Sequence, residues 1–176
     1  IFNKEFKLED KYNKNKLVPF GEFLPFEKFL STYGLKKITR GYKSFSSSTE
    51  RNILNVGDIS FLPLICYEII FSGALNKNTN NYDFILNISE DGWFGNSIGP
   101  VQHFSHSIFR SIEEGKSIIR STNNGISALI DPYGQISDIL ESTYEGVIEI
   151  NRIKNPKKTF FSKYGNNMFF YFIFIY

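Results

Sequence analysis

The chain has 176 residues, which suffices for one domain with a hydrophobic core but is too short for two. Apolar residues make up 41% and charged residues 22%, a balance that excludes a disordered chain and a multi-span membrane protein. The formal net charge is only +2, so we expect no nucleic-acid partner, which would require a concentrated basic face. The single cysteine, Cys66, excludes an internal disulfide.

The first third of the chain predicts one short helix and one buried strand. The helix is expected after Pro25 and should end at Gly34, because glycine readily terminates helices. The polar stretch 36–55 is typical of an exposed loop or an edge hairpin. The apolar run 59–66 predicts a strand, and Pro63 within it indicates that this strand is irregular or near a sheet edge.

The remainder of the chain predicts a helix and more strands. Residues 82–89 form a second apolar strand, and from 101 to 115 the apolar spacing changes to three and four, which is typical of an amphipathic helix. Four further strand candidates follow, separated in part by strong turn signals: 118–122, 126–130, 135–140 and 147–150. Strands that alternate with a helix and then run on as hairpins predict an α/β fold with a mixed sheet.

The last nine residues, 168–176, are all apolar or aromatic. They are consistent with a terminal core strand or with the start of a transmembrane helix, although nine residues cannot span a bilayer. We favour the helix, because three lysines lie shortly before it, as is typical of a membrane-entry flank. We therefore expect a domain over 1–163, and over 164–176 the start of a truncated helix. The chain also opens at Ile1 without a methionine, which favours a fragment of a longer protein.

Two short segments contain candidates for nucleophilic chemistry. Cys66 ends an apolar strand, and strand ends in α/β folds project side chains into the crevice where sites are built. A thiol near a cation becomes a nucleophile, whereas the alternative is an inert core cysteine. Lys14 and Glu22 flank an apolar stretch that contains proline and glycine, so their charges could converge on one cleft. The alternative for this pair is a solvated loop.

Aromatic and imidazole side chains add further candidates. Trp93 and Phe94 lie between two glycines after a strand, which suits a platform for substrate, while the alternative is a buried tryptophan that anchors the loop. His103 and His106 are three residues apart on the predicted helix and could share a ligand. Ordinary core or surface histidines are the more common explanation, because no cysteine or carboxylate is spaced to complete a metal site. We therefore predict no metal.

Four sequence blocks, in this order, resemble the nitrilase-like domain of the apolipoprotein N-acyltransferase family. They are YNKNKLVPFGEFLP from Tyr12, ICYEI from Ile65, DGWFGNSIGPVQH from Asp91 and RSTNNGI from Arg120. The resemblance extends to about Ile150, and it departs from the family pattern at Glu90, where Asn is commoner, and at Val101, often Trp. It implies part of a nitrilase-like α-β-β-α sandwich, the C-terminal part of the family's catalytic domain, followed by the start of a C-terminal transmembrane helix.

The resemblance also implies roles for individual residues. In the family a Glu-Lys-Cys triad carries the chemistry: Cys66 matches its nucleophile and Lys14 the lysine, which would stabilise the oxyanion. Glu22 matches a supporting glutamate, and Tyr67 and Glu68 match the pair that follows the nucleophile. The family's general-base glutamate lies upstream of the lysine, and nothing before Lys14 matches its motif, so we expect this chain to be inactive by itself.

The implied reaction transfers a fatty acyl chain from a phospholipid to the α-amino group of a lipidated N-terminal cysteine, through a thioester on Cys66. The implied partners are a phospholipid donor, a diacylglyceryl apolipoprotein acceptor and a membrane, with no cofactor. The implied location is the bacterial inner membrane, with the catalytic domain on the periplasmic side. The alternatives are a soluble amidase of the nitrilase superfamily that hydrolyses a carbon–nitrogen bond, and an inactive domain that binds lipid or peptide.

Overall fold

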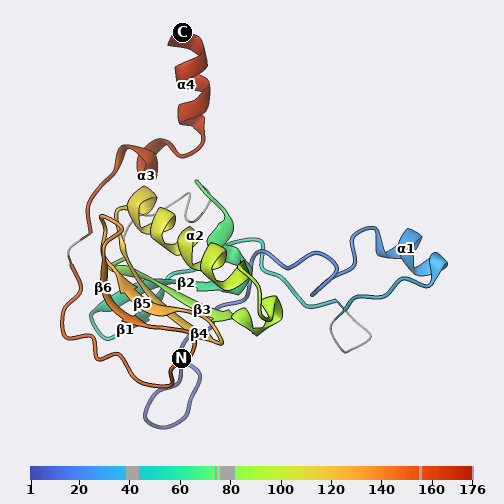
Figure 1. Cartoon of the computed structure of the whole chain (residues 1–176), viewed down its shortest axis with the longest axis horizontal. Helices are drawn as coiled ribbons and strands as arrows, with labels where there is room; N and C mark the ends of the chain where they lie inside the picture. Colours follow the sequence, from blue (N-terminus) through green and yellow to red (C-terminus); the bar gives the residue numbers. More distant parts are fainter. Residues whose placement is uncertain (39–43, 74, 76–81, 155, 176) are drawn as a thin grey trace.

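The computed structural model describes residues 1–38, 44–73, 75, 82–154 and 156–175. Within these residues the strands form one six-stranded mixed sheet, ordered β1-β2-β3-β4-β5-β6 (Figure 1). The central strands β2, β3 and β4 are parallel, and the outer pairs are antiparallel. The strands are β1 (Leu54–Val56), β2 (Ile59–Ile65), β3 (Phe84–Glu90), β4 (Ser117–Asn123), β5 (Ser127–Ile130) and β6 (Ile136–Leu140). The predicted mixed α/β sheet is confirmed.

Helix α2 (Gly99–Glu114) connects β3 to β4 and lies across one face of the sheet (Figure 1). Pro100 lies in its first turn, and Gly115 ends it with a φ of 62°, a conformation that glycine adopts without steric cost. The helix buries polar side chains as well as the core residue Phe104, whereas Val101 is half exposed. Its buried polar residues are His103, Ser107, Arg110, Ser111 and Glu114. These buried polar side chains on the face of α2 toward the sheet are the first indication of a functional site.

The hydrophobic core lies between the parallel strands and α2. Strands β2 and β3 are mainly apolar and bury Leu62, Leu64 and Ile85 completely, whereas Ile88 near the end of β3 is 54% exposed. The core side chains are Leu62, Leu64, Ile69, Leu75, Tyr82, Ile85, Phe104, Ile118, Ala128 and Ile130. Pro63 does not make β2 an edge strand, but β1 pairs with β2 only as far as Phe61. Pro63 therefore lies where β2 pairs with β3 alone, so its missing N–H disrupts no second ladder.

One prediction of local structure is wrong, and one alternative is excluded. Residues 147–150 form no strand, because none of the strands in the described residues pairs with them. Val147 is 89% exposed. The C-terminal run is not a core strand, since α3 (Phe160–Tyr164) and α4 (Asn167–Ile175) are helical. Figure 1 shows α4 projecting away from the sheet. None of the helices in the described ranges combines the length and the hydropathy needed to cross a bilayer.

The predicted N-terminal helix is confirmed as α1 (Glu27–Leu30), which continues into a 3₁₀ turn, η1 (Ser31–Tyr33). It ends at Gly34, whose φ of 76° is left-handed. This helix lies at the end of an arm that extends beside the sheet (Figure 1). Of the polar stretch 36–55, residues 39–43 lie outside the described residues, and the last two belong to β1.

Candidate functional site

Cys66 lies at a strained turn at the end of β2. The strand ends at Ile65, and Cys66 opens a 3₁₀ turn, η2 (Cys66–Ile70), with a φ of 50°. A side chain with a β-carbon pays roughly 1–2 kcal/mol to adopt this left-handed conformation. Such strain persists only where the surrounding structure enforces it, and it clusters at functional sites. The thiol is partly buried, so an inert cysteine of the closed core does not describe it.

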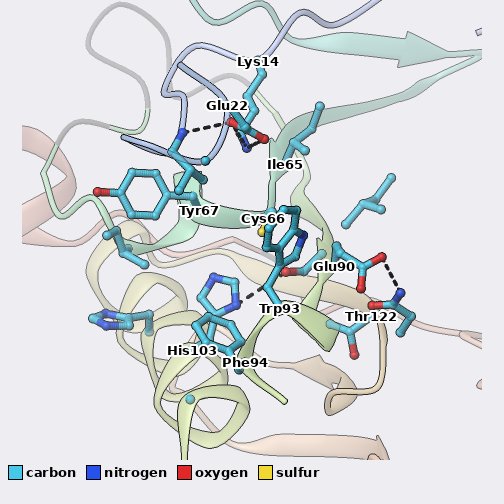
Figure 2. Close-up of a pocket in the computed structure, with 18 of the residues that line it drawn as sticks. Lys14, Glu22, Ile65, Cys66, Tyr67, Glu90, Trp93, Phe94, His103 and Thr122 are labelled. Carbon is cyan, nitrogen blue, oxygen red and sulfur yellow. Dashed lines mark hydrogen bonds and ion pairs between the residues drawn. The ribbon is translucent and has the colours of Figure 1, made fainter. Parts of the chain in front are cut away.

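Cys66 lines a cavity of about 950 Å³ at the carboxyl ends of the parallel strands (Figure 2). Residues 88–90 at the end of β3 and 121–123 at the end of β4 form its floor, which is where α/β sheets place their sites. Eight of the candidates named from sequence line this cavity: Lys14, Glu22, Cys66, Tyr67, Trp93, Phe94, His103 and His106. The structure therefore brings these candidates together from four separate segments.

Lys14 and Glu22 form an ion pair in the wall of the cavity. Lys14 Nζ lies 2.7 and 2.8 Å from the two carboxylate oxygens of Glu22. The backbone N–H of Val18 donates to the same carboxylate at 2.9 Å. Lys14 is only 9% exposed, so the solvated-loop alternative is wrong. The pair holds an ammonium group in the cavity that also contains the thiol.

Glu68 does not line the cavity but holds two of its walls together. Its side chain is fully buried. One carboxylate oxygen accepts hydrogen bonds from the backbone N–H groups of Asn15 and Lys16, at 2.8 and 3.2 Å. The other accepts from the backbone N–H of Ile65, at 2.8 Å. Glu68 thus ties the residues that follow Lys14 to the residue that precedes the thiol.

Tyr12 and Arg51 complete the surroundings of this carboxylate. The Tyr12 hydroxyl lies 3.0 and 2.9 Å from the two oxygens of Glu68, and Arg51 Nε lies 3.7 Å from one of them. Burial, and then the charge of Glu68, raises the pKa of Tyr12 well above its usual range. The phenol therefore stays protonated and acts as a donor. A buried carboxylate with this many donors is a structural clamp, and not a free acid or base.

A second buried polar network lies beneath the cavity, and sequence reasoning did not find it. Arg120, in the middle of β4, donates to Asp91 Oδ2 at 2.7 Å and also contacts Asn87. Ser89 Oγ donates to Asp91 Oδ1 at 2.6 Å. His103 Nδ1, from α2, lies 2.9 Å from the same oxygen. An arginine directly after two isoleucines in a strand was the available signal, because a buried charge requires a partner.

The charges in this network are mutually stabilised. Burial acts to raise the pKa of Asp91, but hydrogen bonds from His103 and Ser89, together with the charge of Arg120, outweigh it and hold this pKa below its ordinary value. Burial lowers the pKa of Arg120, and Asp91 opposes that shift. The network therefore contains a carboxylate and a guanidinium at neutral pH. It joins β3, β4 and α2 under the floor of the cavity.

The aromatic loop is exposed to the cavity. Trp93 and Phe94 belong to the 3₁₀ turn η3 (Asp91–Phe94). Trp93 is 60% exposed, so the alternative of a buried anchor is wrong. The ring of Phe94 lies 5.4 Å, centroid to centroid, from the imidazole of His103. The loop thus supplies apolar surface next to the thiol.

The two histidines do not form a metal centre. His103 is buried against Asp91, whereas His106 is only partly buried, and burial followed by the charge of Arg110 lowers its pKa. Across the described part of the chain, no three His, Cys, Asp or Glu residues are grouped as metal ligands. The imidazole of His103 is instead part of the polar network.

Comparisons with known proteins identify the family of the chain. Residues 1–152 match the family model described as carbon-nitrogen hydrolase. The apolipoprotein N-acyltransferase of Brucella melitensis biotype 1 is 41% identical over 152 residues, which are 86% of this chain and 28% of that protein. The enzyme of the same name from Bradyrhizobium diazoefficiens is 40% identical over 156 residues, which are 88% of this chain and 29% of that protein. The chain thus spans less than a third of these relatives.

Among solved structures, a cysteine-to-serine mutant of the Nesterenkonia AN1 amidase from the nitrilase superfamily superposes with a TM-score of 0.50 at 16% identity. The match covers 80% of this chain and 50% of that one, and it supports the nitrilase-like fold. The resemblance to apolipoprotein N-acyltransferases that the four sequence blocks indicate is confirmed by the relatives. By its family match and by its fold, the chain belongs to the carbon-nitrogen hydrolase family.

Proposed function

We propose that this chain carries the cysteine and lysine of an apolipoprotein N-acyltransferase. The reaction would move a fatty acyl chain from a phospholipid to the α-amino group of a diacylglyceryl apolipoprotein. The observation that carries the proposal is the strained Cys66 in one cavity with the buried ammonium of Lys14. The names of relatives at about 40% identity point to the same chemistry. An enzyme is therefore favoured over an inactive binding domain.

In the first half-reaction the Cys66 thiolate attacks the ester carbonyl of the phospholipid. A carbon–sulfur bond forms, the ester carbon–oxygen bond breaks, and the lysophospholipid leaves after taking a proton. Lys14 would stabilise the oxyanion together with the backbone N–H of Tyr67, which follows the nucleophile. Losing one such donor typically slows the reaction about 100- to 1,000-fold. The ion pair with Glu22 orients the Lys14 ammonium for this role.

In the second half-reaction the amine attacks the thioester, a carbon–nitrogen bond forms and the thiolate leaves. One amine proton must go to a base. Glu22 is a poor candidate, because Lys14 and the N–H of Val18 already occupy its oxygens. Glu68 is likewise occupied and lies outside the cavity. We expect the base to be the glutamate that the family places ahead of the lysine.

The apolar surfaces support a lipid substrate and a membrane location. Ile88 and Trp93, which are 54% and 60% exposed, line the cavity and suit an acyl chain more than the small polar substrate of an amidase. We infer that 1–163 is the C-terminal part of the catalytic domain, with part of an α-β-β-α sandwich, and that 164–176 is the start of a transmembrane helix. The exposed aromatic side chains of α4 support that start. The protein would then act at the bacterial inner membrane, on its periplasmic side.

The nucleophile is tested on the chain itself in detergent micelles. An activated ester, 4-nitrophenyl palmitate, should leave one palmitoyl group on Cys66, seen by intact-protein mass spectrometry. The adduct should be absent in Cys66→Ala and unchanged in Ser105→Ala, whose hydroxyl bonds only a carbonyl of its own helix. An adduct that persists without the thiol would contradict the assignment.

Turnover is tested in a chimera, with residues 1–152 replacing the matching segment of the Brucella melitensis relative. Phospholipid and a diacylated lipopeptide should yield the triacylated product. Release of free fatty acid without any acylated peptide would instead favour a hydrolase of the amidase type. A folded chimera that forms neither thioester nor product would contradict the proposed function.

A further inference from the structure

His103 presents an unpartnered nitrogen to the cavity. The side chain is 4% exposed, and its ring lies among the side chains that line the cavity (Figure 2). Within the described residues, Nε2 is buried and has no hydrogen-bond partner. Buried polar atoms in folded proteins are nearly always paired, so an orphan atom in a cavity wall calls for an explanation. A bound ligand in the cavity would supply the missing partner.

The network beneath the cavity determines which chemistry this nitrogen offers. Nδ1 of His103 lies 2.9 Å from the Asp91 carboxylate, which can only accept, and 3.2 Å from Arg120 Nη2, which can only donate. We assign the proton to Nδ1 because its contact with Asp91 is the shorter one. Arg120 and Ser89 donate to the same carboxylate and fix its position. When Nδ1–H is donated to Asp91, the lone pair of the imidazole lies at Nε2, the atom without a partner. A lone pair selects a ligand with an N–H or O–H group.

Of the two substrates of the proposed reaction, the acceptor fits this requirement. The ester group of the donor has no N–H or O–H at its reacting atoms, whereas the acceptor approaches the thioester as an amine. We propose that His103 binds the acyl acceptor, with Nε2 accepting a hydrogen bond from its α-amino N–H. This inference rests on the proposed function and adds a substrate-binding residue to it.

The hydrogen bond would orient the nucleophile. An amine that donates one N–H to Nε2 is restrained in rotation, and its lone pair can be directed at the thioester carbonyl on Cys66. Phe94, packed against the imidazole, restricts the ring to one orientation, and Asp91 holds it from behind. No bond is made or broken at His103. His103 positions the amine, and the amine transfers its proton to the general base.

Two substitutions separate binding from a merely structural role. In His103→Asn the amide can replace Nδ1 toward Asp91 but cannot reach the position of Nε2. In His103→Gln the longer amide reaches the Nε2 position, where its oxygen can accept, and the contact with Asp91 is lost. A binding role predicts that Gln is the better replacement, and a structural role predicts that Asn is.

The experiment follows the two half-reactions separately in detergent, in the chimera that carries residues 1–152 of this chain and the upstream part of the relative. Cys66 is loaded with palmitate from 4-nitrophenyl palmitate, and the thioester is then consumed by a diacylglyceryl-cysteine lipopeptide. For His103→Asn we expect normal loading and about a tenfold lower kcat/KM for the amine, mainly through KM, which is the size of one lost hydrogen bond. His103→Gln should recover most of this loss.

Several outcomes would overturn the inference. Equal slowing of both half-reactions in His103→Asn, or a better result for Asn than for Gln, would make His103 structural. An unchanged rate of thioester aminolysis in His103→Asn would mean that Nε2 binds water and not the acceptor amine. Slower loading from an ethanolamine phospholipid, but not from a choline phospholipid, would assign the bound amine to the donor headgroup. Failure of the unsubstituted chimera to load Cys66 would refute the proposed function itself, and the inference with it.

Discussion

Replacing Glu68 by glutamine tests whether one buried carboxylate holds the two walls of the site together. The substitution keeps the shape of the side chain but exchanges one accepting oxygen for a donating NH₂ group. If that group faces the Ile65 N–H, one backbone donor loses its acceptor. If it faces Asn15 and Lys16, two donors lose theirs. In either orientation at least one buried N–H is left without a partner.

The magnitude follows from these contacts. A buried N–H without an acceptor costs about 1–3 kcal/mol, and the surviving hydrogen bonds lose their charge assistance, about 1 kcal/mol more. We expect Glu68→Gln to lower the free energy of unfolding by about 3 kcal/mol. With a urea m value of about 2 kcal/mol/M, the midpoint would fall by about 1.5 M.

The assay is urea unfolding in detergent micelles, with the alkylation rate of Cys66 by iodoacetamide as a local readout. Glu50→Gln is the matched control, because it removes the same charge from an exposed side chain and should change the unfolding free energy by no more than about 0.5 kcal/mol. If Glu68→Gln stays within about 1 kcal/mol of the unsubstituted chain and Cys66 reacts at the same rate, Glu68 is not a clamp.

Three further substitutions probe the site and its support. Lys14→Met should slow release of 4-nitrophenolate from the activated ester about 100- to 1,000-fold, and a near-normal rate would exclude oxyanion stabilisation by Lys14. Burial, and then the charge of Glu113, raises the pKa of Glu114 to about 7 from 4.5, so the folded chain retains a proton that the unfolded chain has lost. The unfolding free energy should therefore fall by up to about 3 kcal/mol as pH rises between these values. Glu114→Gln should flatten this dependence of the unfolding free energy on pH. The same pH dependence in the variant would contradict the role of Glu114. Gly125→Ala would place a β-carbon against the Asp91 carboxylate, so calorimetry should show a loss of about 2 kcal/mol, whereas an unchanged melting temperature would contradict the close approach.

The sequence by itself determined the elements whose signals are local. The apolar runs at 59–66 and 82–89 became parallel strands at the centre of the sheet, where most of their apolar side chains are at least partly buried. The helix between Pro100 and Gly115 was predicted from spacing and from residues that begin and end helices. The cavity at the end of β2 was predicted from the position of Cys66, because strand ends in an α/β fold face the site.

Only the tertiary structure decided which charges are buried together. Arg120 and Asp91 are 29 positions apart, and Glu68 is more than 50 positions from two of the backbone groups that it binds, those of Asn15 and Lys16. Local propensity contains no information about such pairs, because a charge is tolerated inside a protein only once folding has delivered its partner. For the same reason residues 147–150 alternate like a strand yet form none, since a strand exists only when a neighbouring strand accepts its hydrogen bonds.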